Sequence, residues 1–326
     1  MIENKVYQEP YIRIQNIWKA LTSILDPNTI SYRKSMSENF IHMHANKSTG
    51  YCDFSLCLDE KHFPALSIKS SLSDSFHNKK EWLDRIVDYL RKGYYVILYV
   101  DKFYLSEHNS YMRFHFADYL LICGVDELRD ELICRDCFGP TTAFRKAICT
   151  VTEVYEAYVH ANDAADTKDI IYVKQRKENK DGINARQIKS DLIAFLETNI
   201  TSEKISCNLE VFKSADAIIQ SKIRENYGSY YCFLTNVYTL IEDHMNIMAY
   251  RMSVLLDSFH IVEKCNEYAK RVSHCRNQVM RSRMICLKTK EFIGNDTKDF
   301  LCQENHSIHN QYMELVNDII AELKNN

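Results

Sequence analysis

The stretch Gly93–Phe138 reads GYYVILYVDKFYLSEHNSYMRFHFADYLLICGVDELRDELICRDCF, and the predicted fold is organised around it. Its β-branched and aromatic runs alternate with polar segments, a pattern typical of strands joined by loops and turns. The apolar runs lie at 94–100, 119–124 and 131–134, and the last of them leads to Asp136. We therefore expect strand, loop, strand, turn and strand in succession.

The whole chain has 326 residues, more than one domain usually holds, which predicts two domains. Hydrophobic residues make up 46% and charged residues 26%, enough for a buried core and an ordinary hydrated surface. The formal net charge is -3, and nucleic-acid binding favours a basic face, so DNA or RNA is not expected as a partner. Basic runs at 174–180 and 271–283 are interpreted as solvated linker and helix surface.

Twelve cysteines are scattered through the predicted strands and helices. The N-terminus MIENKVYQEP lacks the apolar core of a signal peptide, and no apolar run approaches the roughly 18 residues of a membrane span. We expect a cytoplasmic protein with free thiols and no membrane partner. The scarcity of glycine (7) and proline (4), beside abundant Ile, Lys, Asn and Tyr, suggests an AT-rich bacterial genome.

Helical periodicity marks two segments on either side of the mixed region 29–75. Residues 11–25 place apolar side chains on one face and stop at an Asp-Pro-Asn breaker, which predicts an amphipathic helix. Residues 79–92 carry acids early and bases late, and Gly93 follows as a stop signal. Further elements expected in the first half are short strands near 54–58 and 65–68, a strand at 143–150, a helix at 151–160 and a strand at 170–174.

The polar run 176–184 lacks apolar periodicity and is predicted to be a linker. It separates an α+β domain at 1–175 from an all-α bundle at 185–326. Formation of a homo-oligomer through this bundle is kept as an alternative to a single copy. The expected bundle helices lie at 189–199, 211–225, 230–259, 261–286 and 307–323. Intervals of three and four separate the apolar positions of one predicted seam, which are Cys265, Tyr268, Val272, Cys275 and Val279.

Several short pieces of the central stretch follow one another in a recognisable order. They are Gly93, Val100-Asp101, Phe103-Tyr104, Tyr111, His115-Phe116, the run 119–124, Val125-Asp126 and Asp136. In this order they resemble the papain-like family typified by the N-terminal domain of butirosin biosynthesis protein H, found in bacterial natural-product pathways. The resemblance implies a papain-like domain with an antiparallel sheet, and an acyl carrier protein or a catalytic paralogue as partner.

The resemblance also implies a Cys, His and Asp site. In such a site, a helix N-terminus stabilises the thiolate and later the oxyanion, a histidine acts as base, and a carboxylate orients the histidine. Asp136 matches the carboxylate position. Asp118 stands where the family has its histidine, the second of HFxH. A carboxylate with an ordinary pKa of about 4 is a weak base at neutral pH.

The nucleophile of the family lies at the start of the first helix, here the predicted helix 11–25. Residues 1–51 contain no cysteine, and Asn16, Ile17 or Trp18 lies near the expected position. The leading hypothesis is therefore a non-catalytic member of the family, a pseudoenzyme or scaffold in bacterial peptide or polyketide assembly. The alternative is an active cysteine acyltransferase or hydrolase that transfers or releases a thioester-bound acyl chain.

For the active alternative, Cys52 would be a displaced nucleophile and His115 its base, although a buried thiol explains Cys52 more simply. Cys134 and Cys137 form a CxxC around Asp136, which is typical of redox or half zinc sites. The chain has no second CxxC, so strand-end cysteines account for the pair.

Two histidine pairs, His42 with His44 and His306 with His309, supply possible metal ligands. Neither pair lies in a carboxylate-containing motif, so both are interpreted as surface histidines, and no metal or cofactor is expected. The Met and aromatic residues of 230–259 are interpreted as core, although a Met-rich groove would also suit a flexible acyl chain.

Overall fold

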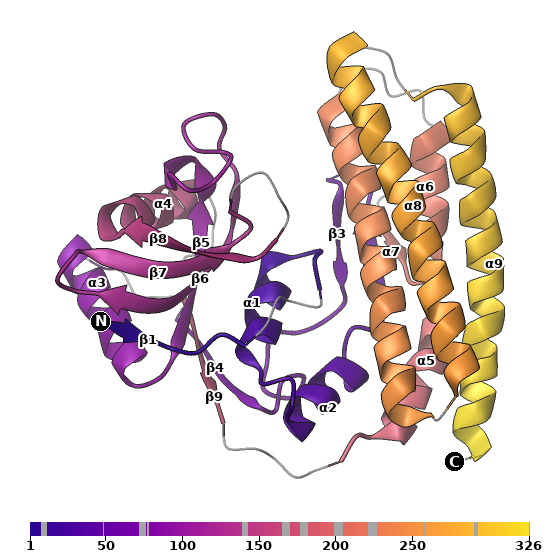
Figure 1. The fold of residues 1–326 in the computed structure, drawn as a ribbon, viewed down its shortest axis with the longest axis horizontal. Coiled ribbons are helices and arrows are strands. Elements are labelled where there is room, and N and C mark those ends of the chain that lie inside the picture. Colours follow the sequence, from indigo (N-terminus) through magenta and orange to yellow (C-terminus); the bar gives the residue numbers. More distant parts are fainter. Residues whose placement is uncertain are drawn as a thin grey trace. The chain divides into compact units, whose positions relative to one another are not determined.

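The computed structural model describes residues 1–7, 12–47, 49–71, 76, 78–138, 143–164, 170–176, 182–198, 205–220, 227–256, 258–289 and 293–325. The chain divides into two compact units. Unit 1 comprises Met1–Tyr32 and Leu58–Asp181, and unit 2 comprises Arg33–Cys57 and Gly182–Asn326. Unit 1 mixes strands and helices, whereas unit 2 is mainly helical (Figure 1). The expected α+β class with a helical C-terminal region is confirmed.

Unit 1 is built on an antiparallel sheet. Its strands are β1 (Ile2–Glu3), β4 (Leu66–Ser71), β5 (Tyr95–Asp101), β6 (Ala117–Asp126), β7 (Glu131–Asp136), β8 (Arg145–Thr150) and β9 (Ile170–Gln175). They follow the order β4-β9-β5-β6-β7-β8, and β1 pairs with β6. Because β5, β6 and β7 all come from the stretch Gly93–Phe138, the predicted succession of three strands is confirmed.

Three helices accompany the sheet: α1 (Asn16–Ile24), α3 (Lys79–Arg91) and α4 (Val151–Ala164). One face of the sheet packs against α3 and α4, and Trp82 of α3 is fully buried among alternate strand residues. The side chain of Asn78 caps α3 by accepting the Glu81 N–H at 3.0 Å. The predicted helix at 11–25 is shorter in the structure, because the chain is still extended at Gln15.

The pairing of β1 with β6 depends on Gly124. The register of β6 against β7 shifts between Ile122 and Gly124. A Cβ atom at position 124 would lie 2.4 Å from the Ile2 carbonyl oxygen, which is too close for any other residue type. The glycine therefore lets β1 approach the middle of the sheet.

Unit 2 contains α5 (Ala185–Glu197), α6 (Glu210–Gln220), α7 (Tyr227–Leu255), α8 (Phe259–Thr289) and α9 (Asn295–Asn325). In Figure 1, α7, α8 and α9 run alongside one another as a bundle. All five residues of the predicted seam in 261–286 are buried in α8. The helical character expected after residue 185 is confirmed by these five helices.

Unit 2 also contains a small antiparallel sheet and a segment from the first part of the chain. Its strands are β2 (Met43–Asn46), β3 (Tyr51–Phe54) and β10 (Ile205–Cys207), in the order β10-β2-β3. Most of α2 (Ile30–Glu38) belongs to the same segment. The predicted division at 176–184 placed residues 33–57 with the first domain, whereas the structure places them in unit 2. Residues 177–181 of the expected linker lie outside the described residues.

Arg251 of α7 explains why this early segment joins the bundle. Its side chain is fully buried, Nε donates to the Ser37 carbonyl at 2.6 Å, and an Nη atom donates to the Asn39 carbonyl at 2.7 Å. Burial lowers the pKa of Arg251 to about 10, so the guanidinium remains charged at neutral pH. The hydrogen bonds therefore supply charged donors to two backbone carbonyls at the end of α2.

Replacing Arg251 by methionine keeps the apolar length but removes both donors. We expect Arg251→Met to lower the free energy of unfolding of unit 2 by about 3–5 kcal/mol, because it leaves buried carbonyls without donors. Urea unfolding measures the loss, and hydrogen exchange should show faster opening of β2. Arg281→Met, at an exposed position of α8, is the matched control and should change little. Equal effects of the two variants would contradict the anchoring role of Arg251.

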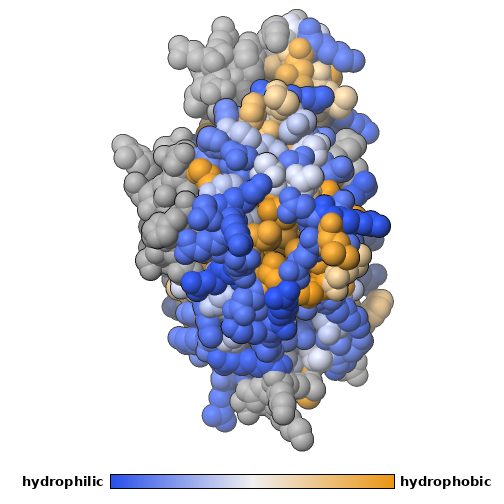
Figure 2. Space-filling view, turned by 90° about the vertical axis from the view of Figure 1, so that its left-hand side faces the viewer, coloured by the Kyte–Doolittle hydropathy of each residue, from blue (hydrophilic) through white to orange (hydrophobic). Residues whose placement is uncertain are grey.

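Within the described residues, no helix combines the length and apolar character that crossing a bilayer requires. The face of the molecule in Figure 2 is mostly hydrophilic, with hydrophobic residues gathered near its centre. All twelve cysteines lie in the described part of the chain and carry free thiols.

Candidate functional site

A buried polar cluster lies at one end of the unit 1 sheet. Lys102 follows β5, Asp118 lies near the start of β6, and Asp136 ends β7. Antiparallel neighbours bring these chain positions to the same end, and Val100 pairs directly with Asp118. Alternation along each strand puts the three polar residues on the same side as the core residues two positions away. The hydrophobic face therefore ends in a polar cluster.

Asp136 is the centre of the cluster, and both of its carboxylate oxygens are engaged. Lys102 Nζ donates to Oδ2, and both side chains are fully buried. Oδ1 accepts from Asn16 Nδ2 at 2.7 Å and from the Cys137 backbone N–H at 2.7 Å. Lys102 Nζ also donates to the Tyr119 carbonyl at 2.9 Å. The carboxylate is thus neutralised and hydrogen-bonded, as a buried charge must be.

Asn16, the first residue of α1, connects the helix to the sheet. Its amide nitrogen donates to Asp136, and its amide oxygen accepts from Lys19 Nζ at 3.1 Å. Lys19 is one helical turn further along and 6% exposed. The carboxylate of Asp136 thereby lies at a helix N-terminus, where the helix dipole favours a negative charge.

Cys137 is the thiol of the cluster. It is half-buried, and its Sγ lies 3.1 Å from Lys19 Nζ and 3.6 Å from Asn16 Oδ1. Burial raises the pKa of the Cys137 thiol, while the nearby Lys19 ammonium opposes that shift. The neutral thiol is consequently favoured at neutral pH.

Asp118 differs from the sequence-based expectation of an ordinary carboxylate. Burial raises the pKa of Asp118 to about 6, although Lys102 acts in the opposite direction. Its Oδ1 accepts the backbone N–H of Tyr119 at 2.7 Å. A carboxyl group that titrates near pH 6 exchanges protons close to neutrality, which an ordinary aspartate does not. Desolvation of this half-buried side chain thus makes Asp118 a stronger base than the ordinary carboxylate expected from the sequence.

His115, the candidate base of the active alternative, is engaged elsewhere. Its Nδ1 lies 2.6 Å from Asp101 Oδ2, its ring stacks on Phe103, and 67% of its side chain is exposed. Burial acts to raise the pKa of Asp101, but hydrogen bonds from His115 and neighbouring backbone amides outweigh burial and lower this pKa. His108 lies in the same loop between β5 and β6. Burial lowers the pKa of His108, and its Nδ1 accepts the Ser110 N–H at 3.1 Å. His115 therefore forms a surface pair with Asp101.

Cys52, the candidate nucleophile, lies in β3 of unit 2, whereas His115 belongs to unit 1. Its side chain is fully buried, and its thiol donates to the Gly50 carbonyl at 3.8 Å. Burial, followed by Cys232 and Asp53, raises the pKa of Cys52 strongly. A thiol in this environment is a poor nucleophile, because the thiolate is the reactive form.

Of the other candidate groups, Cys134 lies in the hydrophobic core next to the polar cluster, and the candidate histidine pairs belong to unit 2. Cys134 is fully buried and hydrogen-bonded beside Cys149, so the two cysteines of the CxxC have different surroundings. Burial lowers the pKa of His44, which contacts Ser55. Among the described residues, no group of three or more His, Cys, Asp or Glu side chains is placed to hold a metal ion.

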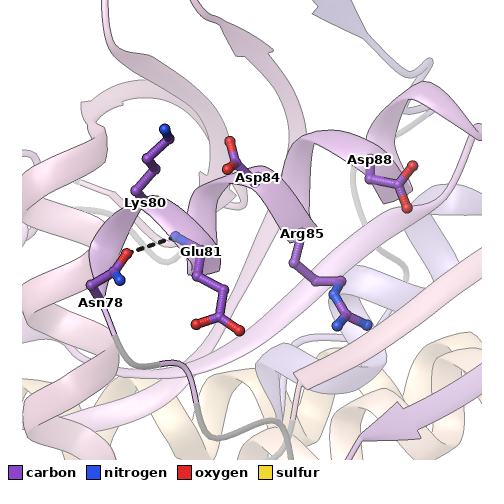
Figure 3. Close-up of a pocket in the computed structure, with 6 residues that line it drawn as sticks. All are labelled: Asn78, Lys80, Glu81, Asp84, Arg85 and Asp88. Carbon is purple, nitrogen blue, oxygen red and sulfur yellow. Dashed lines mark hydrogen bonds between the residues drawn. The ribbon is translucent and has the colours of Figure 1, made fainter.

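A shallow hollow runs along α3, lined by Asn78, Lys80, Glu81, Asp84, Arg85 and Asp88. All six residues come from one helix or its cap, and their side chains point to different sides of it (Figure 3). Acidic and basic groups are mixed along the helix and do not converge on one point. The hollow therefore offers no set of groups that would act together on a substrate.

No protein-family model matches this chain. A search of the curated proteins finds no match either.

The buried ion pair predicts a large difference between two lysine variants. We expect Lys102→Met to lower the free energy of unfolding of unit 1 by about 3–5 kcal/mol, because Asp136 would keep an uncompensated buried charge. Lys92→Met removes an ion pair with Asp88 whose side chains are 58% and 50% exposed, and should change stability by less than about 1 kcal/mol. Urea unfolding compares the two, and similar losses would contradict the role given to Lys102.

The raised pKa of Asp118 predicts a pH-dependent effect on stability. The folded state retains a proton that the unfolded state has released, so this group's contribution is fully present below about pH 4 and is lost as pH rises through about 6. Asp118→Asn should therefore be more stable than the natural protein above pH 7, by about 1–3 kcal/mol, and the difference should vanish near pH 4. Unfolding by urea at several pH values measures this difference.

Asp84→Asn, at an exposed position of α3, is the control and should show no such pH-dependent gain. A less stable Asp118→Asn at pH 8 would mean that the ionised carboxylate supports the fold.

Proposed function

We propose that unit 1 is a non-catalytic member of the papain-like acyltransferase family that the central stretch resembles. The observation that carries this proposal is the hydrogen bond between Asn16 at the start of α1 and Asp136 at the end of β7. In the resembling family, a cysteine nucleophile begins the first helix, and a carboxylate occupies the position of Asp136. In this chain α1 begins with the carboxamide of Asn16, followed by Ile17 and Trp18, and none of these three side chains is a thiol.

The chemistry of the cluster supports this proposal. A carboxamide is not a nucleophile toward a thioester, and its amide nitrogen already donates to Asp136. Asp118, at the position of the family's catalytic histidine, carries a carboxyl group instead of an imidazole. Lys102 forms a direct ion pair with Asp136. The ion pair of Lys102 with Asp136 and the hydrogen bond from Asn16 stabilise the fold and keep the Asp136 carboxylate from orienting a catalytic base.

The proposed role is therefore binding. We propose that the protein acts in bacterial peptide or polyketide assembly, where it binds an acyl carrier protein or a catalytic paralogue. The alternative, an active cysteine acyltransferase or hydrolase, would need a different thiol. Cys137 is the cysteine that lies within the polar cluster, so it replaces Cys52 as the nucleophile to be tested under that alternative.

The deciding experiment incubates the protein with an acyl-loaded carrier protein and follows both partners by intact mass spectrometry. We expect complex formation in size-exclusion chromatography without acylation of the protein or release of the chain. The unloaded carrier separates recognition of the acyl chain from recognition of the carrier. Chain release or an acylated protein would overturn the non-catalytic proposal, and Cys137→Ser and Cys52→Ser would then identify the thiol responsible.

A second experiment tests the resemblance itself by rebuilding the expected pair. In the double variant Asn16→Cys/Asp118→His, the introduced thiol should be alkylated by iodoacetamide at pH 7 at least about tenfold faster than in Asn16→Cys alone, because an adjacent imidazole favours the thiolate. Peptide mapping separates this thiol from the natural cysteines, and the exposed Cys57 serves as an internal rate standard. Equal rates in the two variants would contradict a papain-like arrangement of these positions.

A further inference from the structure

Lys19 and Cys137 form a contact between an amine and a thiol that the proposed function does not use. Lys19 Nζ lies 3.1 Å from Cys137 Sγ, and the two residues are 118 positions apart in the sequence. Lys19 is 6% exposed, whereas Cys137 is half-buried and so partly accessible to solvent. The contact joins α1 to the residue that follows β7.

The two lysines of the cluster have different partners. Lys102 forms an ion pair with the buried carboxylate of Asp136. Lys19, within the described part of the chain, donates to the amide oxygen of Asn16 and to the thiol of Cys137. The amide oxygen of Asn16 is a neutral acceptor, and its hydrogen bond holds the Lys19 nitrogen against the sulfur of Cys137. This arrangement pre-positions a nitrogen nucleophile beside an oxidisable thiol.

We propose that Lys19 and Cys137 form a reversible covalent S–N cross-link when the protein meets a peroxide. Cys137 first loses its thiol proton to solvent, and the thiolate attacks one oxygen of hydrogen peroxide to give a sulfenic acid. The departing hydroxide takes a proton from the Lys19 ammonium and leaves as water, so the lysine becomes a neutral amine. The neutral amine of Lys19 then attacks the sulfur, an S–N bond forms, and the S–O bond breaks with loss of a second water. Sulfur is oxidised by two electrons and peroxide is reduced by two, so the chain loses two hydrogen atoms.

The surroundings favour this nitrogen over a second cysteine. The cysteine nearest to Cys137 in the sequence is Cys134. It is fully buried inside the sheet core, and its thiol donates to the Leu132 carbonyl at 3.9 Å. Lys19, in contrast, already touches the sulfur of Cys137. A second thiol, as a reductant, would attack the sulfur, release the lysine amine, and restore Cys137 after a further exchange. Both residues belong to unit 1, so the cross-link forms without the proposed partner.

The test treats the full-length protein with hydrogen peroxide at pH 8 and analyses it by intact mass and peptide mapping. We expect a loss of about 2 Da and a cross-linked peptide pair that contains Lys19 and Cys137, because condensation of a sulfenic acid with nitrogen expels water. Dithiothreitol should restore the original mass. The cross-link closes a long loop of the chain, so the oxidised protein should unfold at a higher urea concentration.

Two variants and one control decide the assignment. Cys137→Ser removes the sulfur, and Lys19→Arg keeps the positive charge but removes the amine, so both should abolish the cross-linked peptide. Cys57→Ser, which replaces an exposed thiol, should leave it unchanged. Three outcomes would overturn the proposal. The first is oxidation of Cys137 to sulfenic, sulfinic or sulfonic acid without any cross-link. The others are a gain of about 14 Da, which means that the cross-link retains one bridging oxygen, and a cross-link that persists in Lys19→Arg.

Discussion

The buried ion pair between Lys102 and Asp136 is the interaction on which unit 1 depends most. It connects the ends of β5 and β7, while the Tyr119 carbonyl of β6 accepts from the same lysine. Asn16 adds α1 to the same carboxylate. A charge this deep is tolerated only when every lone pair and proton finds a partner, so the strand ends and the helix have to meet in one arrangement. The pair thus ties the positions of separate elements to one another.

Much of the fold follows from the sequence because hydrophobic periodicity is a local signal. The strands of Gly93–Phe138, the helix at 79–92 and the seam of α8 lie where their spacing predicts them. The assignment of residues 33–57 does not follow, because it depends on Arg251, more than two hundred positions away. The sequence around an arginine in an aromatic and Met-rich helix does not indicate which backbone carbonyls its guanidinium will bind. Long-range polar contacts of this kind are invisible to pattern analysis.

The candidate site could be predicted in part. The resemblance pointed to Asp118 and Asp136 and left Asn16, Ile17 and Trp18 open at the nucleophile position, and in the structure Asn16 donates a hydrogen bond to Asp136. Lys102 and Lys19 were missed, although each had a weak signal. Lys102 continues the inward alternation of β5, and Lys19 lies three residues after Asn16 on the same helix face. Lysine at such positions is normally solvated, so only burial reveals its role. The raised pKa of Asp118 likewise depends on burial that spacing does not encode.

The inclusion of residues 33–57 in unit 2 also affects how the chain is completed during synthesis. This segment, with Phe40, Met43 and Phe54 that are buried in the folded protein, leaves the ribosome before the five helices of unit 2. Its edge partner β10 and its anchor Arg251 are made only much later. Until then its apolar side chains have no bundle to pack against, and the nascent chain carries an exposed, strand-forming segment. Cutting the chain at residue 181 would therefore release a fragment that holds an orphaned part of unit 2.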